Sequence, residues 1–317
     1  MNKLLLTTAL LAATAGAASA EITLSGSGRF GLVYNDAAGA GESTTALSYR
    51  LRVNVNAKFE ADNGVTYGGR IRFQNTESSS VVSGFDPITG ETLTKNAATF
   101  SPAMLYVEAS GVRVEVGNAN TAIDSVALMY NPEIGFTGSS YGDPQGSFFS
   151  FSSGAYQQDR VGVYAAYSVS GVNLKASYVQ ADQFDSTDDA NETSIAADYT
   201  MGQFTVAAAY ADKGAGIIGN YVTFVGVAYK VNDVANVGLN YNDNGLSPLG
   251  KTTTIYGNYT INGVTLGAYV SDSDAAAADT AYGLGASYDL GGATLAGAIH
   301  SGFDGETFAD LGVNMSF

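Results

Sequence analysis

Six of the seven arginines in this 317-residue chain lie before residue 120, and four of them form two pairs spaced two residues apart. The stretch SYRLRVNVNAKFE, residues 48–60, alternates arginine, asparagine and lysine with large apolar residues. In an extended strand this alternation places polar side chains on one face and apolar ones on the other. Guanidinium groups keep their charge, so they act on other molecules through their field. The set is Arg29, Arg50, Arg52, Arg70, Arg72 and Arg113.

Catalysis has little support in the sequence. His300 is the single histidine, and Ser301 and Asp304 follow it. A nucleophile, a base and an orienting group must converge in space, which neighbours in sequence do not establish. We therefore expect no enzyme activity, and a hydrolase is the weakest of the alternatives.

Residues 1–20, MNKLLLTTALLAATAGAASA, have the features of a secretory signal peptide. One lysine precedes a short apolar run that ends on Ala18-Ser19-Ala20, a small-x-small cleavage pattern. The run is too short, and too often interrupted by threonine, for a membrane-spanning helix. We therefore expect a signal peptide at 1–20 and an exported domain at 21–317, in a bacterium with two membranes.

The exported part is strongly acidic and has no cysteine. Without residues 1–20, and so without Lys3, the formal charge changes from −16 to −17. Such a charge excludes nucleic acid as a partner. The absence of cysteine excludes disulfides and thiolate metal ligands, so the fold must depend on strand pairing and packing.

Alternating segments recur along the whole exported part. None after residue 20 has eighteen consecutive apolar residues, so only a closed barrel could cross a membrane. A soluble sandwich is the alternative, but we expect it to include strands buried on both faces. The sequence therefore predicts an all-β fold, a 16-stranded antiparallel transmembrane barrel with a wet interior. The expected strands are 21–35, 47–60, 65–75, 99–109, 112–117, 157–169, 172–180, 193–200, 203–212, 221–231, 235–242, 251–261, 264–272, 280–290, 293–300 and 308–317.

Short and long connectors alternate between these strands. Pairs such as Ser110-Gly111, Ser170-Gly171 and Asn262-Gly263 tolerate the positive φ of tight hairpin turns. The longest connector, 118–156, has too many apolar side chains for a solvated loop. We expect it to fold inward and pack on the barrel wall, with a short helical turn at 122–130.

Several strings resemble the general trimeric porins of purple non-sulfur and related alphaproteobacteria. They include EITLSGSGRFGLVY at 21–34, GNANTAIDSVALMYNPEIGF at 117–136, SSYGDPQGSFF at 139–149 and ADLGVNMSF at 309–317. The resemblance covers essentially the whole exported part. It implies an outer-membrane barrel whose third outer loop folds into the lumen and constricts it. It also implies a homotrimer in contact with outer-membrane lipid and lipopolysaccharide.

The resemblance gives the charged residues a role at that constriction. The six arginines fall on the polar parity of their strands, and the loop offers Asp124, Glu133 and Asp143 opposite them. A basic wall facing an acidic loop sets a transverse field, in which small hydrophilic solutes and ions pass while apolar solutes must displace ordered water. The implied function is passive general diffusion. The alternative for any single arginine is that it pairs with a carboxylate and fixes the loop.

A second acidic group lies in the connector near 181–192. Carboxylates on such a loop could bind calcium or magnesium, which prefer oxygen ligands. No EF-hand spacing is present, so solvated loop charge is the preferred interpretation, and no cofactor is required in either case. An acidic entrance also predicts weak cation selectivity. The candidate Ca²⁺ ligands are Asp182, Asp185, Asp188 and Asp189.

A barrel channel selective for one sugar or one ion is the remaining alternative. Such channels use an aromatic slide or a dense basic ladder, and the long connector is rich in aromatic residues. These residues cluster where a folded loop needs a core, so we expect them to anchor the loop instead. They are Tyr130, Tyr141, Phe148, Phe149 and Phe151.

Overall fold

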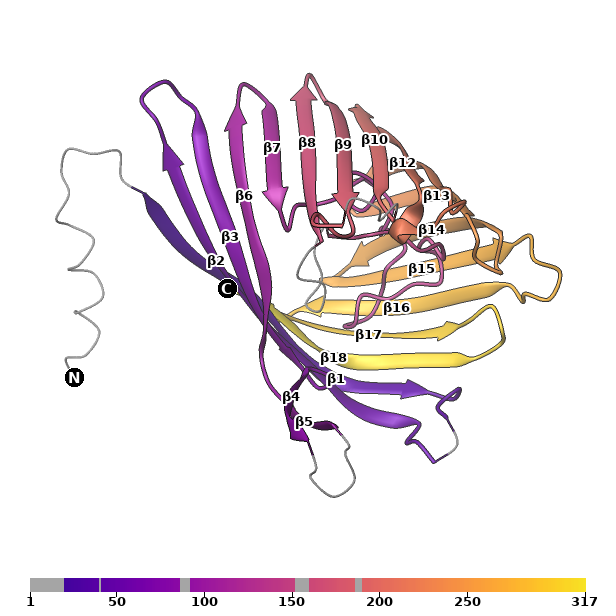
Figure 1. The fold of residues 1–317 in the computed structure, drawn as a ribbon. Coiled ribbons are helices and arrows are strands. Elements are labelled where there is room, and N and C mark those ends of the chain that lie inside the picture. Colours follow the sequence, from indigo (N-terminus) through magenta and orange to yellow (C-terminus); the bar gives the residue numbers. More distant parts are fainter. Residues whose placement is uncertain (1–19, 40, 86–91, 152–159, 186–189) are drawn as a thin grey trace.

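The computed structural model describes residues 20–39, 41–85, 92–151, 160–185 and 190–317. Sixteen strands form one closed antiparallel barrel, and β1 pairs with β18 to close the ring (Figure 1). The predicted all-β class and the sixteen barrel strands are confirmed. In these described ranges the helical structure is limited to η1 (Gly214–Gly216), a single 3-10 turn.

The barrel strands follow the predicted ranges to within a few residues. The predicted strand 157–169 begins outside the described residues and is observed from Val161. The strands are β1 (Glu21–Asn35), β2 (Thr45–Glu60), β3 (Thr66–Thr76), β6 (Thr99–Ala109), β7 (Val112–Gly117), β8 (Val161–Val169), β9 (Val172–Gln180), β10 (Glu192–Met201), β11 (Phe204–Asp212), β12 (Val222–Asn232), β13 (Ala235–Asn244), β14 (Lys251–Ile261), β15 (Val264–Ser273), β16 (Ala281–Asp289), β17 (Ala293–Ser301) and β18 (Thr307–Ser316).

Two local features differ from the expectations. Connector 76–98 contains a hairpin, β4 (Ser80–Phe85) with β5 (Thr92–Asn96), which is too short to give a clear alternating pattern. The helical turn expected at 122–130 was wrong, because this segment consists of consecutive turns. The backbone N–H groups of Ala122 and Ile123 donate to the hydroxyls of Ser177 and Ser194 on the barrel wall, at 2.9 and 3.2 Å. Leu128 has a φ of 70°, in the left-handed region, and therefore interrupts a right-handed helix.

The tight turns have the predicted chemistry. Ser110 and Gly111 have φ values of 50° and 81°, and Asn262 and Gly263 have values of 51° and 80°. Two successive residues with positive φ match the hairpin turn whose twist suits antiparallel strands. These turns join neighbouring strands at one end of the barrel, while the longer connectors lie at the other end (Figure 1).

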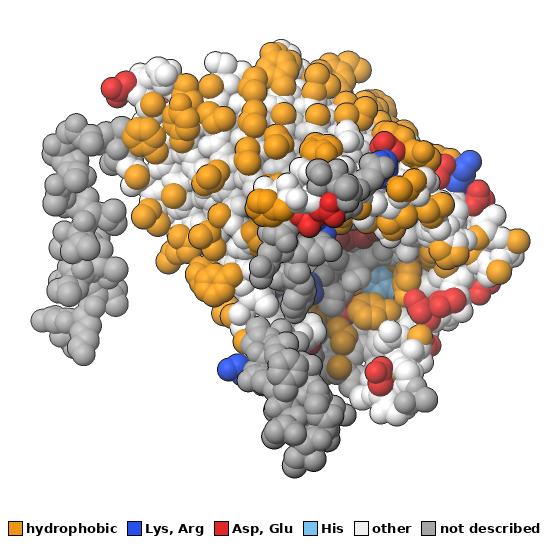
Figure 2. Space-filling view, in the orientation of Figure 1, with side chains coloured by type: hydrophobic (Ala, Val, Ile, Leu, Met, Phe, Trp, Pro, Cys, Tyr) orange, Lys and Arg blue, Asp and Glu red, His pale blue; other side chains and the backbone are white. Residues whose placement is uncertain are grey.

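The apolar side chains that alternate along the strands face outward. Leu24 is 70% exposed, Leu47 75% and Leu105 64%, and hydrophobic side chains spread over the outer face (Figure 2). Such exposure suits a hydrocarbon surrounding and would be unfavourable over this area in water. In the described residues no helix is long and apolar enough to cross a membrane.

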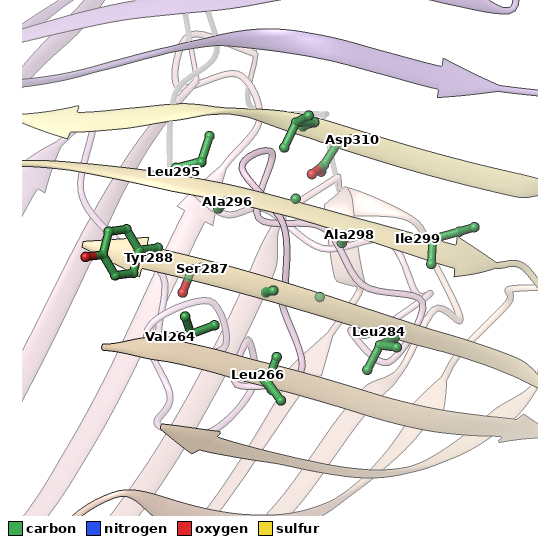
Figure 3. A pocket seen from close by; sticks show the side chains of 14 residues that line it. Val264, Leu266, Leu284, Ser287, Tyr288, Leu295, Ala296, Ala298, Ile299 and Asp310 are labelled. Atoms are coloured by element: carbon green, nitrogen blue, oxygen red, sulfur yellow. The ribbon is translucent and has the colours of Figure 1, made fainter. Parts of the chain in front are cut away.

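A shallow hollow on this outer face lies between β15 and β18 and has a volume of about 620 Å³ (Figure 3). Leu266, Leu284 and Leu311 border it, and all three are exposed on the outward parity. The hollow therefore belongs to the apolar exterior and not to the lumen.

Part of the inner face is dry. Ala207, Ala209 and Ala211 of β11 point inward, and with Val222 and Phe224 of β12 they form a buried cluster with the long connector. Ile123 and Met129 of the connector are completely buried in this cluster. We use the term inner loop for residues 118–151, the described part of this connector. The apolar segment of the inner loop packs on small side chains of the inner wall. This packing explains why the inward-facing residues of these strands are apolar.

Candidate functional site

The arginine set lies on the inward face of neighbouring strands. Arg29 of β1 is directly opposite Arg50 of β2, and Ser27 is opposite Arg52. On the other side of β2, Asn56 pairs in register with Arg70 and Asn54 with Arg72. Five guanidiniums are therefore carried by three adjacent strands, and we call Arg29, Arg50, Arg52, Arg70 and Arg72 the arginine sector.

Neutral groups orient the side chains of this sector. Arg52 Nε donates to Gln74 Oε1 at 2.8 Å, and Arg72 Nε donates to Asn54 Oδ1 at 2.8 Å. Arg29 donates through Nη1 to the carbonyl of Thr137 in the inner loop. Arg72 also lies 5.6 Å from the ring centroid of Phe151. None of the ion pairs formed among the described residues includes a member of this sector.

Arg113 has a different environment. Its Nη1 and Nε donate to the carboxylates of Glu108 and Glu115 at 2.9 and 2.8 Å, and its guanidinium lies 3.7 Å from the ring centroid of Tyr106. It follows the short turn at Ser110 and lies beside β6 on the barrel wall. Arg113 is therefore neutralised by wall carboxylates, and the structure does not bring it together with the acidic residues of the inner loop.

Of the three acidic residues of the inner loop, Asp124 and Asp143 are half-buried and Glu133 is exposed. The surrounding protein reduces the solvation of the Glu133 carboxylate and raises its pKa to about 7, although the charges of Arg29 and Arg50 oppose this shift. Burial and then the charge of Glu133 raise the pKa of Asp143 to about 8. Burial also raises the pKa of Asp124, which accepts a 2.6 Å hydrogen bond from the Tyr130 hydroxyl. Of the three, Glu133 is the carboxylate that interacts with the arginine sector.

Three buried wall carboxylates fix the backbone of the inner loop. Glu115 accepts from the N–H of Asn120 at 3.0 Å, near the start of the loop. Asp310 accepts from the N–H groups of Phe136 and Thr137 at 3.0 and 3.2 Å. Glu192 accepts from the N–H of Phe149 at 2.8 Å, near its end. Charge-assisted hydrogen bonds of this kind are about twice as strong as neutral ones.

Hydroxyl and amide groups of the opposite wall complete this attachment. Asn240 donates to the carbonyl of Leu128 at 2.9 Å, and Asn244 accepts from the N–H of Gln145 at 2.8 Å. The Tyr269 hydroxyl accepts from the N–H of Tyr141 at 3.0 Å. These wall residues and the three carboxylates were not identified as site residues from the sequence. In the sequence they appear only as polar residues at strand positions that face inward. This pattern does not indicate which atom of the loop each side chain will contact.

The aromatic residues of the inner loop take part in its attachment. Tyr130 and Phe148 pack against the buried cluster, and Tyr141 donates to Glu306 at 2.5 Å. The Phe149 ring lies 4.2 Å below the guanidinium of Arg160, and Phe151 forms a β-bridge with Asn120. They therefore contact the wall or the loop itself and do not form a continuous track.

His300 lies on the inner wall in a structural setting. Its Nδ1 is 2.9 Å from the Tyr269 hydroxyl, and its side chain is 2% exposed. Residues 138–142 have the G-x-S-x-G spacing of a nucleophile elbow, but they belong to an irregular loop and not to a strand-turn-helix. Ser140 Oγ accepts a hydrogen bond from the N–H of Gly142 at 2.8 Å. This geometry does not form a catalytic triad.

The proposed calcium ligands lie only partly in the described structure. Asp182 accepts hydrogen bonds from the N–H groups of Phe184 and Asp185, while Asp188 and Asp189 are outside the described residues. Among the residues that the structure does describe, no group of three or more histidine, cysteine or acidic side chains is placed to hold a metal ion.

The geometry defines a transmembrane barrel with an apolar exterior, a charged inner wall and a loop attached to that wall. Comparison with known proteins gives the family. Residues 7–157 and 143–247 match the Gram-negative porin family, and the chain belongs to it. It is therefore an outer-membrane channel protein and not an enzyme.

Individual relatives agree with this assignment. The chain is 45% identical over 304 residues to a porin of Fuscovulum blasticum, covering 94% of this chain and all of that protein. It is 27% identical to a porin of Rhodobacter capsulatus, with the same coverage. A solved structure of a mutant Rhodopseudomonas blastica porin superimposes with a TM-score of 0.85 at 43% identity, covering 94% of this chain and all of that one. A structure of an engineered protein studied for asymmetric conductivity gives 0.84 at 44% identity.

Proposed function

We propose that this porin is a passive diffusion channel in which the arginine sector faces the carboxylates of the inner loop at a constriction. Small hydrophilic solutes and ions are the permeating molecules. The observation that carries this proposal is the contact between the arginine sector and the inner loop, where Arg29 donates to the carbonyl of Thr137, four residues from Glu133. The charges of Arg29 and Arg50 also act on Glu133. Opposite charges on the wall and the loop give a field across the path, and dipolar solutes align in it more readily than apolar ones.

The bulk charge of the protein adds a second element to the proposal. The chain is strongly acidic, and long-range potential raises the local concentration of counter-ions at a channel entrance. We therefore expect weak cation selectivity. A channel selective for one sugar is less well supported, because the inner-loop aromatics are used in attachment.

Recording in planar bilayers tests both elements. Purified protein should give ohmic conductance steps, and the reversal potential in a KCl gradient should show a modest preference for K⁺. A clear preference for Cl⁻ would contradict the proposed selectivity. Failure of correctly folded protein to form any conducting unit would contradict the channel proposal itself.

Residues 1–20 are proposed to be a signal peptide removed on export. The small-x-small ending at Ala20 supports this, and β1 starts at the next residue, Glu21. Mass spectrometry of the protein isolated from outer membranes should give an N-terminus at Glu21. An intact Met1 in that material would contradict the assignment.

A homotrimer in contact with lipid and lipopolysaccharide is also proposed. Its support is the resemblance to trimeric porins and the exposed apolar outer face. Small residues on the outward face of β1 would allow close packing of a neighbouring subunit, but a Cβ at Gly26 would lie 2.5 Å from the Phe317 ring of the same chain. Gly26 therefore makes room for an intramolecular contact. Three simultaneous conductance increments on insertion would support the trimer.

Passive diffusion needs no cofactor. Bound Ca²⁺ at Asp182, Asp185, Asp188 and Asp189 is kept as a secondary hypothesis, supported by the acidic sequence of that connector. Calcium should then raise the melting temperature, and Asp182→Asn should reduce that increase. An equal response of both proteins would contradict the hypothesis.

A further inference from the structure

Two arginines of the sector lack a compensating negative charge. The charged groups that act most strongly on Arg52 are four other arginines, and those acting on Arg72 are two. Both side chains are partly buried on the inner face. Like charges held together with limited solvation raise the local positive potential, which an anion would lower. The neighbours are Arg29, Arg50, Arg70 and Arg72 for Arg52, and Arg50 and Arg70 for Arg72.

The hydrogen-bond partners of these two guanidiniums are uncharged amide groups. Gln74 and Asn54 accept from the Nε atoms of Arg52 and Arg72, each at 2.8 Å. An amide oxygen fixes the guanidinium plane as a carboxylate would, but it leaves the positive charge intact. Each bond uses the Nε atom, and among the residues that the structure describes no hydrogen bond engages the terminal N–H groups of Arg52 or Arg72.

The strand register places the two guanidiniums on adjacent rows. Arg52 is opposite Gln74, and the pair of Asn54 and Arg72 lies two residues away, after Arg52 on β2 and before Gln74 on β3. Arg52 and Arg72 are thus diagonal neighbours, a relation in which Cα atoms lie about 7–8 Å apart and long side chains can reach one another. Glu133 of the inner loop and Glu77 of connector 76–98 act on Arg29.

We propose that Arg52 and Arg72, oriented by Gln74 and Asn54, form a binding subsite for oxyanions such as inorganic phosphate and the phosphate groups of permeating solutes. Two orientated guanidiniums can donate several hydrogen bonds to one oxyanion, which chloride cannot accept with the same geometry. The inference rests on the proposed function, because the solute must reach the inner face through an aqueous path. Gln74 and Asn54 are positioning residues, since they act through the arginines.

Binding at such a subsite differs from ion selectivity. Selectivity follows the summed field of an acidic protein, while the subsite acts over hydrogen-bond distances. A pore that prefers K⁺ over Cl⁻ can therefore still retain phosphate. Phosphate should reduce the KCl current in a saturable manner because a bound anion occupies the path.

The test is the single-channel KCl current of the full-length exported protein at increasing inorganic phosphate and constant ionic strength. The wild type should show saturable reduction. Arg52→Gln with Arg72→Gln should raise the apparent Kd for phosphate about tenfold or more, as expected for loss of charged hydrogen bonds. Gln74→Glu, which is isosteric and places a carboxylate on Arg52, should do the same if the double variant does not fold.

Asn258→Asp is the matched control. It adds the same negative charge on the inward face of β14, six strands away from β2 in the barrel order, and should leave the phosphate response unchanged. Equal loss of the response in Gln74→Glu and Asn258→Asp would overturn the subsite, because only the general field would then matter. So would a conducting wild-type channel with no saturation. Absence of conductance in the wild type would contradict the proposed function itself.

Discussion

The inner face of this barrel has two contrasting halves. On β1 to β3 the guanidiniums are partly buried, and those of Arg52 and Arg72 have only neutral or positively charged neighbours. On β9 to β15 small apolar residues and fully buried hydroxyls and amides hold the inner loop. Asn240, Asn242 and Thr254 on this side are completely buried.

The contrast separates a structural surface from a functional one. Buried polar groups are normally satisfied by hydrogen bonds, and on the loop-holding side the Asn240 amide N–H and the Ser194 hydroxyl bond to the backbone of the inner loop. The arginine sector instead retains charge that no described ion pair neutralises. Retained charge costs stability unless water or a solute compensates for it. We interpret the loop-holding side as the support that positions the opposing charges.

The largest effect is expected from a charge placed beneath the inner loop. Ile123 is completely buried in the cluster with Phe224, so Ile123→Asp would bury an unpaired carboxylate, at a cost of several kcal/mol. The loop should leave its seat while the barrel persists, and the unitary conductance and the open-channel noise should rise. Ile123→Val, which costs about 1 kcal/mol, is the control. Unchanged conductance in Ile123→Asp would show that the loop does not narrow the path.

A smaller effect is expected at the carboxylate that holds the middle of the loop. Asp310→Ala would leave the N–H groups of Phe136 and Thr137 without their acceptor, at about 1–3 kcal/mol for each group. The melting temperature should fall and current fluctuations should become more frequent. Asp233→Ala, in an exposed turn, is the control and should change neither quantity. Equal behaviour of the two variants would contradict the role of Asp310.

The smallest effect is a change of selectivity with pH. The pKa values of Glu133 and Asp143 are about 7 and about 8, so both carboxyls are mostly neutral at pH 6 and charged at pH 9. Negative charge on the inner loop therefore increases with pH, and cation preference should increase in the same direction. Reversal potentials in a KCl gradient measure this change. Glu133→Gln should remove the part of the change near pH 7, and an unaltered profile would contradict the assignment.

The architecture could be predicted from the sequence because each strand has its own alternation of polar and apolar residues. The parity of residues 48–60 and the turn at Asn262-Gly263 are local properties, so the barrel strands and their order followed from them. The hairpin β4–β5 was missed because six and five residues give too little alternation. The helical turn at 122–130 was wrong because Leu128 adopts a positive φ of 70°, which the sequence alone does not reveal.

The candidate site was harder to predict from the sequence, because its contacts are not local. Parity predicts that Arg52 and Arg113 both point inward, but it does not indicate that Gln74 orients the first while Glu115 neutralises the second. It also does not predict that Glu133 alone among the three inner-loop carboxylates meets the arginines. These differences depend on contacts between residues far apart in sequence, which the strand register and the path of the loop determine.

The most direct test of the central claim uses the absence of cysteine from the chain. Arg50→Cys and Arg72→Cys would each introduce one thiol on the inner face, and Leu51→Cys one on the outer face, where Leu51 is 51% exposed. A membrane-impermeant, charged thiol reagent added during single-channel recording should change the current of both arginine variants and leave Leu51→Cys unchanged. Reaction at Leu51→Cys with no reaction at Arg50→Cys and Arg72→Cys would contradict an aqueous path along the arginine sector.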